Sequence, residues 1–267
     1  YVEPETAIDN VYLDLHHRAD PALALAQTEA LASLIESVGV PVKRFAGWPG
    51  QPDGVFSNNV FATAPGRAVV GHMAFPSRRA ESQREDIRRW LIEQGYALTD
   101  LSCLNCIAEL TGPLIIDRAR NVGLCGMSGR VDEAGVQAMH PALGLDLTFC
   151  FDLAPGEYHT NVVLSVLAGR ACIFDPGAIA DRTVVDTLEK AFEGSCVTIT
   201  AQEKQAFVGN CIALTDRDLF MSAKAEQALS AGTRHALQAL GFTIHSTDLS
   251  ELELAGGSLR CMVTELF

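Results

Sequence analysis

The chain has 267 residues, of which 48% are hydrophobic and 20% charged, and this balance excludes a disordered, collagen-like or coiled-coil protein. Its formal net charge of −13 repels phosphate backbones and anionic lipid surfaces, so we expect neither nucleic acid nor a membrane as a partner. The sequence has no apolar run of roughly 20 residues and no basic segment followed by an apolar one at its start, which predicts a soluble, cytoplasmic protein.

The first predicted element is a helix that begins after Asp20-Pro21 and ends before Gly39, since aspartate caps a helix and proline suits its first turn. Four later apolar runs are each interrupted by a tight turn and then resume, which predicts four β-hairpins. Each turn carries an arginine, namely Arg67, Arg118, Arg170 and Arg217. Their spacing of about fifty residues indicates an internal repeat.

A helix and a further strand follow each hairpin. The segment 85–95 places Ile87, Trp90 and Leu91 on one helical face and precedes the strand-like Tyr96-Ala97-Leu98. The corresponding helices of the other hairpins are predicted at 132–139, 184–192 and 233–241. Each module therefore consists of two strands, a helix and a third strand.

Counting the opening helix as the remnant of another module gives five modules in a single domain over residues 1–267. Such units bury their sheets against one another, which predicts a five-fold pseudosymmetric α/β propeller with helices outside and turn loops gathered at the centre. A two-layer sheet of alternating strands and helices is the alternative, but the even spacing of the arginines favours the ring. Because the first module lacks a strand, we expect residues 261–267 to run beside the start of the chain and close the ring.

A glycine pair, Gly256-Gly257, precedes the last of eight cysteines, Cys261. The glycines allow a tight turn, which would deliver this thiol at the head of a final strand facing the centre. The alternative is that Cys261 is a buried core cysteine. Most of the other cysteines lie in apolar stretches, which favours this interpretation for them and indicates a reducing compartment. Cys103 and Cys106 form a CxxC motif without a second ligand pair, so no metal site is predicted.

Several polar residues share one position in the repeat, the leading edge of a hairpin. They are Asp53 and Asn59, then Glu109, then His159 and Asn161, and finally Asn210. In a ring these edges point toward one axis. Together with Cys261 they would assemble a thiol, an imidazole and carboxylates in one pocket.

At this level the chain resembles the pentein, or amidinotransferase, superfamily of guanidine-modifying enzymes over nearly its whole length. The resemblance is to the dimethylarginine dimethylaminohydrolase, arginine dihydrolase and citrulline-utilisation hydrolase branches. It depends on the order and spacing of the segments 52–59, 76–81, 109–112, 128–130, 158–161 and 256–261. The fold that it implies is the five-module propeller.

The resemblance also implies roles for individual residues. Cys261 resembles the nucleophile, His159 the general acid and base, and Glu109 the carboxylate that orients His159. The substrate-binding residues that it implies are Asp53 for the guanidinium, Arg78 and Arg130 for the α-carboxylate, and also Asn59 and Asn161. Asn161 stands where deiminases often have a second aspartate, and Asn58-Asn59 replaces the Glu-Asp pair of many methylarginine hydrolases.

These residue types suit hydrolysis of a C–N bond in the guanidino or ureido group of arginine, an N-methylated arginine or a related amino acid. A thiolate would attack the guanidinium carbon, and histidine would protonate the departing ammonia or alkylamine. The thiouronium intermediate would then react with water, without a metal or organic cofactor. His159 must be protonated in the first half of the reaction and neutral in the second, which predicts a bell-shaped dependence of the rate on pH around neutrality.

Three alternatives differ in the second reactant or in the class of protein. An amidinotransferase would pass the amidino group to an amine, and a binding module would hold an arginine-like ligand without turnover. A cysteine protease also needs a cysteine and a histidine, but the acidic pocket favours a small guanidino cation. An exposed strand edge beside the incomplete first module would support a homodimer.

Overall fold

The four predicted hairpins all form in the computed structural model, which describes residues 9–51 and 53–267. Each hairpin is antiparallel, and its second strand pairs in parallel with a third strand that follows a helix. The four sheets are β1 (Phe61–Ala64), β2 (Arg67–Val70) and β3 (Ala97–Asp100); β4 (Leu114–Asp117), β5 (Val122–Met127) and β6 (Leu147–Asp152); β7 (Leu164–Leu167), β8 (Ala171–Phe174) and β9 (Cys196–Thr198); and β10 (Ile212–Ala213), β11 (Asp218–Ser222) and β12 (Thr243–Thr247). The module of hairpin, helix and strand is thus confirmed.

The predicted helices are also present. The opening helix is α1 (Pro21–Ser37), capped by the Asp20 carboxylate, which accepts hydrogen bonds from two backbone N–H groups of the first turn. The helices that connect the second and third strands of the sheets are α3 (Glu85–Glu93), α4 (Glu133–Leu143), α6 (Arg182–Ala191) and α9 (Ala231–Ala239). The remaining helical segments are η2 (Ser57–Asn59), α2 (Pro76–Arg79), η3 (Ala80–Gln83), α5 (Thr160–Val163), η4 (Pro176–Ala178), α7 (Ala201–Gln205), α8 (Ala223–Ala228), α10 (Ser250–Glu253) and α11 (Leu259–Met262).

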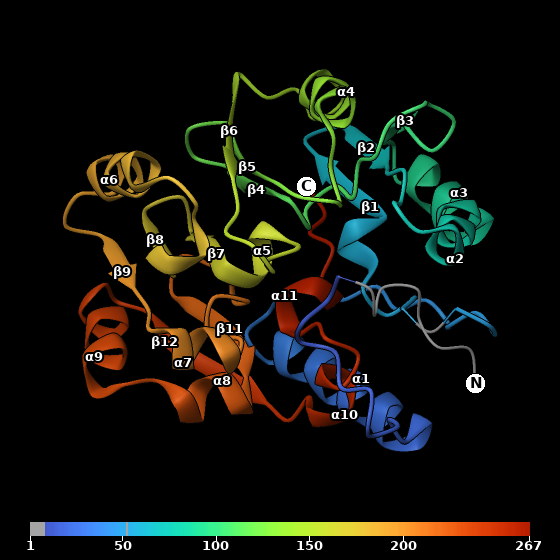
Figure 1. Cartoon of the computed structure of the whole chain (residues 1–267). Coiled ribbons are helices and arrows are strands. Elements are labelled where there is room, and N and C mark those ends of the chain that lie inside the picture. Colours follow the sequence, from blue (N-terminus) through green and yellow to red (C-terminus); the bar gives the residue numbers. More distant parts are fainter. Residues whose placement is uncertain (1–8, 52) are drawn as a thin grey trace.

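The four sheets lie around a common centre, where α5 and α11 meet (Figure 1). Neighbouring modules touch in order around the ring, since α4 packs on β2, β4 on β7, and β7 on β10. The fifth position is filled by α1, α10 and α11, with α1 packed on β12 and α11 on η2. This arrangement is the propeller of repeated α/β modules that the repeat predicts.

The last residues pack against both the opening helix and the first sheet. Residues 1–8 lie outside the described residues, but Met262 and Val263 share a hydrophobic cluster with Leu31 and Ile35 of α1, as expected of a segment beside the start of the chain. In addition, the Thr63 hydroxyl of β1 donates to the Glu265 carbonyl at 2.7 Å. Tyr96 likewise donates to the carbonyl of Phe267 at 2.6 Å. The end of the chain therefore joins the sheet of β1 to β3, while α1 covers the last sheet.

The hairpin turns lie at the outside of the ring, contrary to the prediction that they gather at the centre. Of the four predicted turn arginines, Arg67 and Arg170 are exposed and donate to carbonyls at the end of a helix in the next module. In the second hairpin Arg120 makes this contact in place of Arg118, which lies over the ring of Phe267. The accepting carbonyls belong to Pro141, Ala191 and Leu240. A cation suits the negative end of a helix, so Arg67, Arg120 and Arg170 stabilise contacts between modules. The prediction was wrong because only one end of each hairpin faces the centre. That end is the leading edge, where the first strand begins, and the turn lies at the opposite end.

Candidate active site

Glu109 and His159 meet at the centre of the ring from two successive modules. His159 caps the short helix α5, and its Nε2 donates to Glu109 Oε2 at 2.7 Å. Both side chains are buried, with relative exposures of 0% and 1%. The buried residue after Glu109, Leu110, has a φ of 35° in the left-handed region, a strained conformation that the surrounding fold must hold. The turn before β4 thereby aims this carboxylate at the imidazole.

Two further donors keep the Glu109 carboxylate ionised. The backbone N–H of Ala74 donates to its Oε1 at 3.1 Å, and Arg130 lies 3.3 Å from its Oε2. Burial alone would raise the pKa of Glu109, but the His159 hydrogen bond and the Arg130 charge lower it to about 2. Glu109 is therefore a fixed negative charge that orients His159.

The second ring nitrogen of His159, Nδ1, is buried and has no hydrogen-bond partner among the described residues. Burial lowers the pKa of His159 below the ordinary value of 6.5, and Glu109 does not fully offset this. The neutral ring thus carries its proton on Nε2 and presents Nδ1 as an acceptor. Gly112 leaves room for the ring, because a Cβ there would lie 2.7 Å from Nε2.

Cys261 lies in the helical turn α11, and not at the head of a strand as predicted. Its thiol donates to Asn161 Oδ1 at 3.6 Å and accepts a hydrogen bond from Asn210 Nδ2 at 3.3 Å. Burial raises the pKa of the Cys261 thiol above the ordinary value of 9.0. The resting cysteine is therefore a protonated thiol held between two amides.

The predicted glycine turn before Cys261 is present and is sterically required. Gly256 has a φ of 78°, and a Cβ there would lie 2.4 Å from the side chain of Asn10. The Gly256 carbonyl accepts from Asn10 Nδ2 at 3.2 Å and from the Tyr158 hydroxyl at 2.7 Å. Gly257 passes so close to Phe56 that a Cβ would lie 2.8 Å from its ring. This turn therefore links the segment that carries Cys261 to Tyr158, the residue before His159.

Amide side chains form the rest of the wall near the thiol. Asn161 and Asn58 both donate to the carbonyl of Thr111 at 3.1 Å. Asn58 Oδ1 and Asn59 Oδ1 are buried and, within the described part of the chain, have no hydrogen-bond partner. A buried carbonyl oxygen without a donor is costly, so the Asn59 oxygen is suited to a donor supplied by a ligand.

Both predicted carboxylate-binding arginines are buried, and both already bind carboxylates of the protein. Arg78 forms a bidentate pair with Glu81 and also donates to the backbone carbonyl of Asp53. Arg130 forms a bidentate pair with Asp9, in which Nε lies 2.8 Å from Oδ2, and its guanidinium lies over the ring of Phe75. Asp9 comes from the segment before α1, so the start of the described chain covers the site.

The site residues surround one small cavity of about 20 Å³. Its lining contains Asp53, Asn59, Arg78, Arg130, His159 and Cys261 from the predicted set, together with Asn10, Phe56, Tyr158, Ala255 and Gly257. Glu109 and Asn161 stand behind this lining and hold His159 and Cys261 by the contacts described above. A cavity of this size holds about one water molecule.

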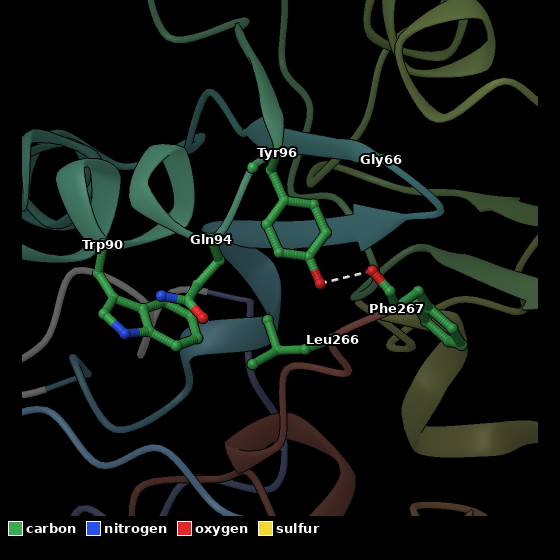
Figure 2. Close-up of a pocket in the computed structure, with 7 residues that line it drawn as sticks. Gly66, Trp90, Gln94, Tyr96, Leu266 and Phe267 are labelled. Atoms are coloured by element: carbon green, nitrogen blue, oxygen red, sulfur yellow. Dashed lines mark hydrogen bonds between the residues drawn. The ribbon is translucent and has the colours of Figure 1, made fainter.

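A larger cavity of about 280 Å³ lies elsewhere, between α3 and the end of the chain. Figure 2 shows Trp90, Gln94, Tyr96 and Leu266 around it, with Tyr96 hydrogen bonded to Phe267. Its lining includes no cysteine, histidine, aspartate or glutamate. The small cavity, which has a nucleophile and a base, is therefore the better candidate for chemistry.

No group of three or more metal-binding side chains occurs among the described residues. Cys103 is exposed and Cys106 is buried, and both are free thiols. None of the helices in residues 9–51 and 53–267 combines the length and the apolar character that a membrane span needs.

Sequence reasoning did not assign Asp9, Asn10 or Tyr158 to the site. It placed Asn210 at the centre, at the leading edge of the fourth hairpin, but gave this residue no role. Asp9 and Asn10 belong to an irregular segment outside the repeat, and their partners lie 121 and 246 residues away in the sequence. No local pattern signals contacts of that kind.

A family model described as N,N-dimethylarginine dimethylhydrolase, eukaryotic, matches residues 1–267. Among curated proteins, an N(G),N(G)-dimethylarginine dimethylaminohydrolase of Mycobacterium tuberculosis is 28% identical over 257 residues, which are 96% of this chain and 80% of that protein.

Two solved structures share the fold. A variant of the N-terminal domain of ArgZ, an arginine dihydrolase of Cyanobacteria, covalently bound to a reaction intermediate, has a TM-score of 0.85 and 19% identity over 99% of this chain and 92% of that one. A dimethylarginine dimethylaminohydrolase variant that forms an adduct with S-methyl-L-thiocitrulline has a TM-score of 0.72 and 20% identity over 94% and 92%.

Proposed function

Because the chain belongs to the eukaryotic N,N-dimethylarginine dimethylhydrolase family, we propose that it is a cysteine-dependent hydrolase of the guanidino group of arginine, an N-methylated arginine or a related amino acid. The observation that carries this proposal is the small cavity lined by both Cys261 and His159. Since Glu109 holds His159 Nε2, the other ring nitrogen is left for proton transfer.

The first half of the reaction forms a bond between Cys261 Sγ and the guanidinium carbon. The thiol proton passes to the neutral His159, and the thiolate attacks the carbon to give a tetrahedral adduct. His159 then returns the proton to the departing nitrogen as the C–N bond breaks, and ammonia or an alkylamine leaves. Glu109 stabilises the transient imidazolium by its charge, as a buried carboxylate does in other nucleophile–histidine pairs.

The second half hydrolyses the thiouronium that remains on Cys261. His159 removes a proton from water, and the hydroxide adds to the same carbon. The C–S bond then breaks, the sulfur leaves as a thiolate, and the proton on His159 restores the thiol. One water is consumed, and the hydroxyl proton of the adduct is lost as the ureido carbonyl forms, so the products are a ureido amino acid and one amine in its ammonium form.

The charges around the cavity favour a substrate with a cationic end and a carboxylate end. Asp53 lines the cavity beside Asn59, whose Oδ1 would accept a guanidinium N–H. Arg130 would bind the α-carboxylate in place of Asp9, which now occupies its guanidinium fork. Because the cavity holds about one water, the segment that carries Asp9 and Asn10 must move before such a substrate enters.

The test is a product screen with arginine, monomethylarginine, dimethylarginine, citrulline and agmatine. We expect a ureido product and a stoichiometric amine from one or more of the amino acids, and no product from Cys261→Ser. Cys211→Ser is the matched control, since Cys211 is also a buried free thiol but lies in the core beside β10. Agmatine lacks the carboxylate for Arg130 and should react least.

The same screen with added glycine or ornithine distinguishes hydrolysis from amidino transfer. A hydrolase gives the ureido product whether or not the acceptor amine is present. A new guanidino compound formed from the acceptor would show an amidinotransferase instead. If no product formed and a haloacetamidine labelled Cys261 no faster than the other thiols, the binding module would be the better description.

A further inference from the structure

Asn210 is completely buried and touches the sulfur of Cys261, yet no step above assigns it a role. It lies between α7 and β10, at the leading edge of the fourth hairpin. In the repeat this is the position that supplies Glu109 in the second hairpin and Asn161 in the third. The fourth module thus contributes to the centre through an amide.

The orientation of the Asn210 amide is fixed by contacts on both of its ends. Its Oδ1 accepts a hydrogen bond from the backbone N–H of Arg260 at 3.0 Å. Its Nδ2 donates to the backbone carbonyl of Asn161 at 2.7 Å and to Cys261 Sγ at 3.3 Å. If the amide rotated by half a turn, an oxygen would face the Asn161 carbonyl and an N–H would face the Arg260 N–H. The donor end is therefore the end that faces the sulfur.

The sulfur needs such a donor when it ionises. Burial raises the pKa of the Cys261 thiol and so disfavours the thiolate, while the Asn210 hydrogen bond, the backbone of Ser258 and the charge of Arg260 lower it. The Asn210 hydrogen bond is the largest of these opposing effects. The other amide in contact with the sulfur, Asn161, presents its Oδ1, which accepts from a thiol but repels a thiolate. Asn210 also fixes the backbone of Arg260, the residue before Cys261, and so sets the position of the sulfur.

We propose that Asn210 is a further active-site residue, which holds the Cys261 sulfur through its Nδ2–H group and stabilises the thiolate that attacks the substrate. This role rests on the proposed function of Cys261 as the nucleophile. Asn210 links the sulfur to the backbone of Asn161 and Arg260, so one side chain sets both the position and the ionisation of the thiol.

The test measures the pH dependence of Cys261 alkylation by iodoacetamide, read at that cysteine by peptide mass spectrometry. In Asn210→Asp a carboxylate oxygen replaces the Nδ2–H group, and the pH of half-maximal alkylation should rise by about one unit or more. The alkylation rate near pH 8 should then fall about tenfold, and kcat for a guanidino substrate should fall with it. Asn210→Ser retains a hydroxyl donor and should lie between this variant and the native protein.

Asn121→Asp is the matched control, because Asn121 also donates through its Nδ2 to a backbone carbonyl, that of Gly144 at 2.9 Å, but lies outside the candidate site. It should leave the alkylation profile of Cys261 in place. If Asn210→Asp does not fold, as judged by thermal melting, Asn210→Ser and Asn210→Ala decide the question, with a larger upward shift expected for alanine. Alkylation profiles that match the native one in the folded Asn210 variants would overturn the role of Asn210.

The two proposals fail differently. Alkylation reports the state of the thiol whether or not any guanidine is turned over. If the native protein shows no turnover but the Asn210 variants shift the alkylation profile, the proposed function alone is wrong. Turnover that persists unchanged in Asn210→Asp would remove the role of Asn210 and leave the proposed function.

Discussion

The two halves of the candidate site are built from different chemistry. On one side His159, Glu109, Arg130 and Asp9 form a chain of charged or titratable groups, in which each contacts the next. On the other side the sulfur of Cys261 is surrounded by Asn161 and Asn210, which carry no charge. The difference indicates that the charged half controls the base, His159, and the amide half controls the position and the ionisation of the sulfur. Changes in the two halves should therefore alter different measurable quantities.

The largest effect is expected in the charged half, from Glu109→Gln. This change removes the charge that stabilises the imidazolium and leaves Arg130 facing a neutral amide, so kcat should fall about 10³- to 10⁴-fold. Steady-state kinetics with the substrate found in the product screen measure this.

Glu81→Gln is the control for Glu109→Gln, because Glu81 is also a buried carboxylate paired with an arginine but does not contact His159. It should lower the melting temperature without a comparable loss of kcat. If Glu109→Gln kept kcat within tenfold of the native value, the division between the two halves would be wrong.

The next effect comes from Gly112→Ala, which changes no charge at all. The added Cβ would lie 2.7 to 2.9 Å from three atoms of the His159 ring, so the ring must shift. A displacement of about 1 Å costs about 10²-fold in rate, and we expect a loss of that size in kcat. Gly47→Ala is the control, since a Cβ there meets nothing within 4 Å. A fully active Gly112→Ala would show that the position of His159 is not critical.

The pH dependence should reveal both halves in one native protein. His159 must be neutral to accept the thiol proton, and burial lowers its pKa, so the acidic fall in kcat/KM should lie below pH 6.5. Cys261 must keep its proton for the departing nitrogen, and burial raises its pKa, so the basic fall should lie above pH 9.0. Beyond each limit the rate should change about tenfold per pH unit. A narrow optimum at neutrality, with both limits inside this interval, would contradict these directions.

The sequence predicts the repeated part of the site well. Equivalent positions in a ring face one axis, so the spacing of Glu109, His159 and Asn161 suffices to place them together before any distance is known. Asn210 is placed at the centre by the same spacing, but an amide in an apolar run has no chemical signal of its own. Its role therefore became visible only from its contact with the sulfur.

The parts that escaped prediction lie where the repeat gives no information. Four residues around Cys261 form a helical turn, and so short a segment has too little periodicity to distinguish a turn from a strand. Arg67 and Arg170 in the turns bind the next module, and a spacing in sequence does not say which end of a hairpin faces the centre. Contacts of Asp9 depend on how an irregular segment returns over the finished ring, which is a tertiary property.

The smallest effect, and the one that tests where the charged half ends, is expected from Asp9→Asn. Asp9 is about one-third exposed, at 33% for its side chain, so its pair with Arg130 is weak enough to exchange with a substrate carboxylate. Without the charge of Asp9, the substrate carboxylate has less competition for Arg130. KM for an α-amino acid substrate should therefore fall about fivefold with kcat nearly unchanged. Agmatine supplies the internal control, because it has no carboxylate and its KM should not improve. A higher KM for the amino acid in Asp9→Asn would mean that Asp9 helps to close the site over the substrate, and the charged half would then extend to substrate binding itself.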